Sequence, residues 1–267
     1  MFYYLLLSIP LLRVSGEHIV GPPNLKLLEC FEYKKNYWIV GHAFHTSSVQ
    51  FKDECLRMCL TSAIRKAKCL SAMHIPNDDE CVISDQNQLT KPDLFVENDS
   101  PASFTVNYFR NICIDPPEND GARRLEVRLH GSQGQGLLEF SQQAGKRMMV
   151  MVVISGLREN SAYDVELIDG LTRITSCQKI KNPHGKKILT VDTDNTGMAV
   201  QPWIHIDNLS LFDEDINDKL VAVIDRSTKL VVDCGRIDQN PENLVSSASS
   251  SFSYIVTGFL AFFYFMF

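Results

Sequence analysis

The cysteines are the residues of this chain whose type and spacing have the clearest chemical meaning. Six of the eight fall between Cys30 and Cys113, and the other two lie far downstream. This density is typical of disulfide-braced secreted domains, because reducing compartments do not keep such bonds. A zinc site is the alternative, but the only close pair, Cys55 and Cys59, has no second close pair to complete a tetrahedral set. The sequence therefore predicts disulfides and an oxidising compartment.

Two histidines three residues apart, His42 and His45, are further candidates for metal binding. No acidic or thiolate partner accompanies them in the sequence, so we interpret them as solvated or locally satisfied side chains. The nearby aromatic residues Tyr33, Tyr37 and Trp38 allow two interpretations, core packing or a binding face. We favour core packing.

The start of the chain has the pattern of a secretory signal peptide. Residues 1–16 hold an apolar run followed by the small residues Val14, Ser15 and Gly16, which form a plausible cleavage site. An N-terminal anchor is the alternative. The apolar run is well short of the roughly 20 residues that a spanning helix needs.

The other end predicts a lipid anchor. Residues 254–267 are apolar and uncharged, and a polar serine-rich spacer precedes them over 239–253. Small residues, a polar spacer and a terminal apolar tail form the pattern of a GPI attachment signal. Ser246 is the predicted attachment residue, with Ser247 and Ser249 as alternatives. A short tail-anchor helix is the alternative. We expect the protein at the cell surface, in the outer leaflet of the plasma membrane, after passage through the secretory pathway.

Composition and charge of the whole chain restrict the class of protein. The formal net charge is −6, so no basic face for nucleic acid is expected. Hydrophobic residues make up 45% and charged residues 22%, as in globular chains. Prolines, a glycine and mixed charges predict a linker over 116–123, which separates a cysteine-rich segment, 25–115, from a second one, 124–238. Sequons at Asn98 and Asn208 predict glycosylation of a secreted chain.

The first segment is predicted to be α+β. Residues 52–66 favour a helix, because Cys55 and Cys59 share one helical face and acidic and basic residues lie at its start and end. Short strands are expected at 68–73, 80–83 and 103–110.

This segment resembles a PAN/apple domain. The matching pieces are Cys30, the E-C-L-x-x-C motif of Glu54 to Cys59, Cys69, Cys81 with Val82, and Tyr108-Phe109 before Cys113. The resemblance implies a helix packed on a small antiparallel sheet, and a module that binds protein or carbohydrate without catalysis. Six cysteines permit 15 pairings. The resemblance implies one set: Cys30–Cys113, Cys55–Cys81 and Cys59–Cys69.

The segment 124–238 is a series of strand-like runs separated by short turns. The runs are LEVRLHG, GLLEFSQ, RMMVMVVISG, AYDVELI, KKILTVD, GMAVQPWIHI, KLVAVID and KLVVDCG. This regular spacing predicts an antiparallel β-sandwich or barrel.

The same segment resembles the Cu/Zn superoxide dismutase fold. The matching pieces are the opening strand from Arg124, the strand from Gly134 to Gln142, Ser155-Gly156-Leu157, Thr190-Val191-Asp192 through Gly197, and Asp233-Cys234-Gly235. The resemblance implies an eight-stranded Greek-key sandwich or barrel with a Cys177–Cys234 disulfide.

The metal chemistry of that family is not expected here. The positions of its copper histidines fall on Val165, Leu167 and Ile224, and that of its substrate-guiding arginine falls near Val231. Apolar side chains offer a metal no donor atom. Three histidines and a lysine complete the comparison: His184 lies near a zinc-ligand position, Lys187 lies near the position of the zinc aspartate, and His130 and His205 match no ligand position. We expect no catalytic residue, no metal and no cofactor.

Together these patterns predict a GPI-anchored, non-catalytic recognition or adhesion protein. It would bind an extracellular protein or glycan through the PAN domain and the metal-free dismutase-like sandwich. The alternatives are an extracellular superoxide dismutase with displaced metal ligands and a secreted carbohydrate-binding protein. The sequence assigns no oligomeric state.

Overall fold

The computed structural model describes residues 25–116, 121–131, 133–168, 177–180, 185–207, 209–212, 216 and 219–237. Several predictions fall outside this part of the chain: the signal peptide 1–16, the spacer 239–253, the tail 254–267, Ser246, Asn208 and His184. Among the described residues, no helix is long and apolar enough to span a membrane.

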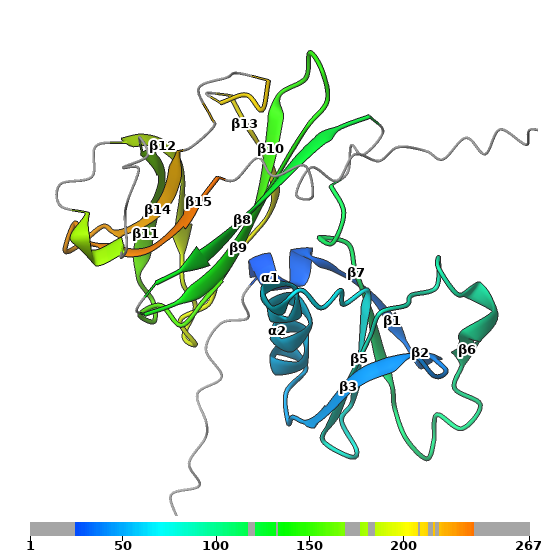
Figure 1. The fold of residues 1–267 in the computed structure, drawn as a ribbon. Coiled ribbons are helices and arrows are strands. Elements are labelled where there is room, and N and C mark those ends of the chain that lie inside the picture. Colours follow the sequence, from blue (N-terminus) through cyan, green and yellow to red (C-terminus); the bar gives the residue numbers. More distant parts are fainter. Residues whose placement is uncertain are drawn as a thin grey trace, which may run out of the picture.

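The N-terminal domain is a sheet crossed by a helix (Figure 1). Its antiparallel five-stranded sheet has the order β1 (Phe31–Lys35), β7 (Asn107–Asn111), β4 (Ser71–Ile75), β5 (Glu80–Ser84) and β3 (Ala43–Ser48). Helix α1 (Leu25–Glu29) precedes the sheet and α2 (Lys52–Ser62) packs on β4 and β5. A separate ribbon pairs β2 (Tyr37–Ile39) with β6 (Phe95–Glu97).

Helix α2 forms where the sequence predicts it and is held by two disulfides. Cys55 and Cys59 lie one turn apart, are both buried, and bond to Cys81 on β5 and to Cys69. The predicted 52–66 helix ends earlier, at Ser62, and continues as a 3-10 turn over Ala63–Arg65. The four disulfides of the chain are Cys30–Cys113, Cys55–Cys81, Cys59–Cys69 and Cys177–Cys234. They are the pairs that the two resemblances imply.

The short strands differ more from prediction. The expected strand at 68–73 is β4 and starts at Ser71, and the one at 103–110 is β7 and starts at Asn107. Four further strands, β1, β2, β3 and β6, were not predicted. Their residues are mostly exposed or half-buried, so they lack the apolar alternation that identifies a strand.

The C-terminal domain consists of eight strands in two four-stranded sheets. The strands are β8 (Arg123–His130), β9 (Gln135–Gln142), β10 (Met148–Ser155), β11 (Ala162–Ile168), β12 (Gly185–Asp192), β13 (Ala199–Ile206), β14 (Leu220–Asp225) and β15 (Val231–Arg236). The sheet orders are β13-β10-β9-β8 and β12-β11-β14-β15. All eight predicted runs therefore form strands, and the inner faces share a buried core that includes Phe140 and Tyr163.

Strand β10 explains how the two domains meet. Its residues from Met148 to Ile154 are all buried, so both faces of the strand are covered. Val150 and Val152 belong to the core between the two sheets, whereas Met151 and Val153 belong to a second core shared with the N-terminal domain. The continuous apolar run is therefore a strand packed on both sides, and the outer face of its sheet is the docking surface for the first domain.

Helices α1 and α2 provide the other half of this junction (Figure 1). Leu27 and Leu56 are fully buried in the shared core, opposite Leu137 on β9 and Val200 on β13. We call this contact the seam.

Polar contacts surround the apolar part of the seam. Arg57 on α2 donates to Asp194 from Nε at 3.1 Å and from Nη2 at 2.8 Å. The other oxygen of Asp194 accepts bonds from the turn of its own loop, at Thr196 and Met198. These bonds hold the pKa of Asp194 at about 2, against the opposing effect of its burial.

The Arg57–Asp194 pair should be measurably coupled. We expect the double-mutant cycle of Arg57→Ala and Asp194→Asn to give a coupling of about 1–3 kcal/mol in denaturant unfolding with intact disulfides, because both side chains are largely buried. The matched control is the exposed pair Arg147–Asp207, whose ion pair spans 3.0 Å and for which we expect well under about 1 kcal/mol. Equal coupling in the two pairs would contradict this account of the seam.

Candidate functional site at the seam

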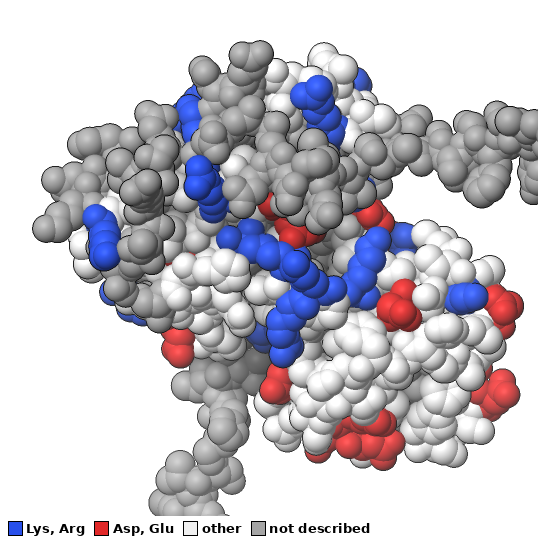
Figure 2. Space-filling model, viewed as in Figure 1, with Lys and Arg blue, Asp and Glu red and all other residues white. Residues whose placement is uncertain are grey.

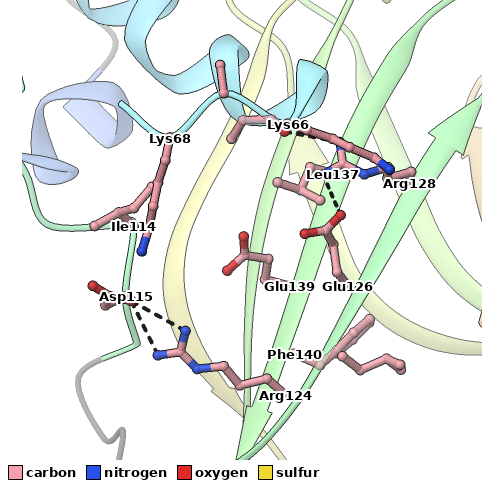
Figure 3. A pocket seen from close by; sticks show the side chains of 13 residues that line it. Lys66, Lys68, Ile114, Asp115, Arg124, Glu126, Arg128, Leu137, Glu139 and Phe140 are labelled. Atoms are coloured by element: carbon pink, nitrogen blue, oxygen red, sulfur yellow. Dashed lines mark hydrogen bonds and ion pairs between the residues drawn. The ribbon is translucent and has the colours of Figure 1, made fainter. Parts of the chain in front are cut away.

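A cavity of about 400 Å³ opens along one side of the seam. Its walls come from four segments, namely the 3-10 turn with the chain that follows it, the chain after β7, strand β8 and strand β9 (Figure 3). Its lining residues are Ala63, Lys66, Ala67, Lys68, Ile114, Asp115, Arg124, Leu125, Glu126, Arg128, Leu137, Glu139 and Phe140. We call this cavity the seam cleft.

The polar lining follows from strand geometry. Alternate residues of a strand point to opposite faces, so Arg124, Glu126 and Arg128 share the outer face of β8. Glu139 on β9 lies directly opposite Glu126 in the strand register. Two like charges in this arrangement repel each other, and such a pair is destabilising unless neighbouring groups compensate.

Two arginines compensate part of this charge. Arg124 lies 3.3 Å from Asp115, and Arg128 lies 2.5 Å from Glu126. Arg128 also donates to the carbonyl oxygens of Ala63 and Ile64, where the helical segment of the first domain ends. Arg128 thus links the two domains and neutralises Glu126 at once.

Glu139 is the unusual group of the cleft. Burial, and next the neighbouring charge of Glu126, raise its pKa to about 7. Among the described residues, no hydrogen bond or close ion pair holds the side chain of Glu139, Lys66 or Lys68, although the charge of Lys68 acts on Glu139 and partly opposes the rise of its pKa. The cleft therefore presents two available ammonium groups and one carboxyl group that changes charge near neutral pH.

The surrounding surface is cationic. Figure 2 shows Lys and Arg side chains gathered in a band along the junction of the two domains, although the whole chain has a net charge of −6. No single segment of the sequence predicts the cleft, because its residues are distant in sequence. The alternation in RRLEVR, residues 123–128, is the one local signal of a charged outer face.

The histidines singled out by the sequence do not form a metal site in the described part of the chain. His42 and His45 are exposed, and His42 Nδ1 lies 4.0 Å from Asp85 Oδ1. His130 and His205 are exposed on β8 and β13. Across the described residues, no group of three or more His, Cys, Asp or Glu side chains could hold a metal ion.

The aromatic residues near β1 and β2 are only partly in a core. Tyr33 is 54% exposed, which differs from the core packing that we favoured. Tyr37 stacks on Phe95 at 5.0 Å between ring centroids, and Trp38 is half-buried. The physical reason is that β1 is an edge strand whose residues after Phe31 are exposed.

The positions that the dismutase resemblance would assign to metal ligands and to the guiding arginine lie in the C-terminal domain. Val165 and Leu167 are buried between the sheets, whereas Ile224 and Val231 belong to a separate apolar cluster with Cys177 and Cys234. At the fifth position, Lys187 Nζ lies 2.6 Å from Asp164 Oδ1. These contacts are packing and ion pairing within the domain.

The predicted glycosylation residue Asn98 is buried. Its Nδ2 donates to Phe104 O at 2.8 Å and its Oδ1 accepts from Ser100 N at 3.0 Å. A glycan at Asn98 therefore requires this loop to rearrange, since the amide nitrogen that would carry it is engaged inside the fold.

Comparison with known proteins identifies the first domain. Residues 30–113 match the PAN domain family, and this region has the helix, sheet and three disulfides described above. PAN domains bind proteins or carbohydrates, and this domain with its disulfides is characteristic of extracellular or secreted proteins.

The comparison also extends beyond that domain. The chain is 63% identical over 220 residues to the uncharacterized protein C34C12.7 of Caenorhabditis elegans, a match that covers 81% of this chain and 77% of the relative. The chain belongs to the family of this nematode protein.

A second buried carboxyl group lies at the far end of the C-terminal domain. Asp233 is fully buried, its Oδ1 accepts from Cys234 N at 2.9 Å, and its Oδ2 has no partner in the described structure. Burial raises its pKa to about 7. Glu139 and Asp233 therefore both favour the protonated form in the folded state.

The free energy of unfolding should fall as the pH rises from 5 to 8. The folded pKa of about 7 exceeds the ordinary values of 4.5 and 3.8, so the unfolded chain ionises first and stability is lost as pH approaches the folded pKa. We expect a loss of about 1–3 kcal/mol per group in denaturant titrations. Glu139→Gln and Asp233→Asn should each reduce the slope of the unfolding free energy against pH.

Asp78→Asn is the control, because Asp78 is exposed on a turn. It should leave the slope as in the wild type. A wild-type stability that rises between pH 5 and 8, or a slope that neither carboxyl variant changes, would contradict the assignment.

Proposed function

We propose that this protein is a non-catalytic recognition or adhesion protein of the cell surface, which binds an extracellular protein or glycan. The observation that carries the proposal is the PAN domain over residues 30–113, docked on a second domain through an apolar seam. A binding module fixed on a rigid support loses little conformational freedom when it binds its partner.

The C-terminal domain is proposed to be a dismutase-like sandwich that has become a scaffold. In support, its two sheets have the orders β13-β10-β9-β8 and β12-β11-β14-β15, so the chain crosses between sheets three times. Val165, Leu167, Ile224 and Val231, aligned with the metal ligands and the guiding arginine, are all buried apolar residues. Copper needs imidazole or similar donors, which these side chains lack.

Metal removal should therefore not affect this domain. We expect a chelator to leave the melting temperature of the full chain unchanged, because a ligand stabilises a fold only if the native state binds it. Reduction of Cys177–Cys234, whose residues are 57 apart in sequence, should lower it, since closing that loop is worth about 4 kcal/mol in the chain-entropy model. The measurements are calorimetry, elemental analysis and a superoxide assay.

Stoichiometric copper in the purified protein, or superoxide removal that a chelator abolishes, would favour the second candidate, an extracellular superoxide dismutase with displaced ligands. The third candidate, a secreted carbohydrate-binding protein, differs from the first in having no lipid anchor.

The GPI anchor is proposed from the tail sequence 254–267, the spacer 239–253 and Ser246. Non-adherent cells that express the full chain should gain binding to a surface coated with extracellular matrix. Phosphatidylinositol-specific phospholipase C should release the protein and remove that binding, because it cleaves the lipid that holds it. Cells expressing the chain with Ser246–Ser249 replaced by bulky charged residues are the control for anchoring.

The two parts of this proposal can fail separately. Matrix binding that survives phospholipase treatment, with the protein still on the cells, would contradict the lipid anchor alone. Efficient release without any matrix binding before treatment would contradict the recognition function.

A further inference from the structure

We infer that the seam cleft binds a single sugar unit that carries an acidic substituent, such as a sulfate or carboxylate group. This inference deepens the proposed recognition function and rests on it, because it names the class of ligand and the place where it binds.

The size and lining of the cleft suit a compact ligand. Its volume of about 400 Å³ lies in the range of small-molecule sites. Ile114 and the alkyl stems of the lysines supply apolar surface, and the charged groups supply directional contacts. Figure 3 shows Lys68 extending into the space beside Asp115 and Glu139, with Lys66 reaching across toward Arg128.

The available charges specify an anion at the mouth of the cleft. Arg124 and Arg128 already pair with Asp115 and Glu126. Lys66 and Lys68 are exposed, and neither side chain forms a close ion pair within the described structure. Figure 3 shows them at opposite sides of the cleft, so each ammonium group can contribute its own charge-assisted hydrogen bond to an acidic ligand. A cationic ligand is disfavoured, because Asp115 and Glu126 are already paired with arginines.

Glu139 specifies a hydroxyl-bearing ligand rather than a bare anion. In its protonated form it can donate one hydrogen bond, and in either form it accepts one. A sugar hydroxyl next to the acidic substituent satisfies both possibilities. A long polyanion is disfavoured by the net charge of −6, which repels it outside the local cationic band.

Binding should depend on pH through Glu139. The groups that face it are Glu126 and Arg124 on β8, Asp115 after β7, and Lys68 after the 3-10 turn. Above pH 7 an ionised Glu139 repels the acidic substituent, and below it the repulsion is absent. Affinity should therefore weaken about fivefold from pH 6 to pH 8.

The test is a ligand-detected NMR titration of the full chain with four probes. N-acetylglucosamine 6-sulfate and glucuronic acid represent the two acidic sugars. N-acetylglucosamine and inorganic sulfate separate the contributions of the sugar and of the anion. We expect at least one acidic sugar to bind about tenfold more tightly than either of these two controls.

Three variants locate the site. Lys66→Gln and Lys68→Gln should each weaken binding about tenfold, since each removes a charge-assisted hydrogen bond. Glu139→Gln should retain binding at pH 6 and lose the decline toward pH 8. Lys35→Gln is the matched control, because Lys35 is exposed at the far end of β1 and should bind as the wild type does. A melting curve establishes that each variant is folded.

The inference is overturned if neither acidic sugar binds, if inorganic sulfate binds as tightly as they do, or if the lysine variants bind like the wild type. None of these results removes the proposed recognition function, because matrix binding can use another surface of the PAN domain. Loss of matrix binding in Lys68→Gln cells would connect the two.

Discussion

The seam between α2 and the outer face of the β13-β10-β9-β8 sheet is the contact on which the rest of the structure depends. Strand β10 has no solvent-facing side, since Met151 and Val153 are buried against the first domain as fully as Val150 and Val152 are buried between the sheets. Separation of the domains would expose this apolar face to water. At roughly 25 cal/mol per Å² of apolar area, that exposure is a strong reason for the two domains to fold as one unit.

The same docking creates the seam cleft. The lysines of the cleft come from the first domain, whereas Glu126 and Glu139 come from the second. Only the fixed contact brings them together, and Arg128 takes part in both tasks, since it pairs with Glu126 and donates to the helical end of the other domain. Like charges directly opposite each other on neighbouring strands, such as Glu126 and Glu139, are unfavourable unless neighbouring groups compensate them. Here Arg128 pairs with Glu126 and burial favours the protonated form of Glu139, so both carboxyl groups can lie together at the cleft.

The parts predictable from sequence were those fixed by short-range patterns. The i, i+4 cysteines gave helix α2, and the eight apolar runs of the second domain gave its eight strands, because period and spacing are read within a few residues. The run from Met148 to Ile154 was predicted as a strand, but its burial on both faces was not. The sequence did not predict what the outer face of β10 packs against, because its partner α2 is about ninety residues away along the chain.

The cleft and the edge strands were missed for a related physical reason. The expected core position of Tyr33 failed because β1 lies at the edge of its sheet, and sequence alone does not tell an edge strand from a central one. Glu139 was not singled out in the sequence, because the raised pKa of about 7 results from its burial in the folded protein and from the nearby charge of Glu126. Chemistry that arises between domains is thus a property of their packing. In this chain, the residues of the seam and of the seam cleft are those at which one domain shields the other from water. They distinguish the protein from two independent modules.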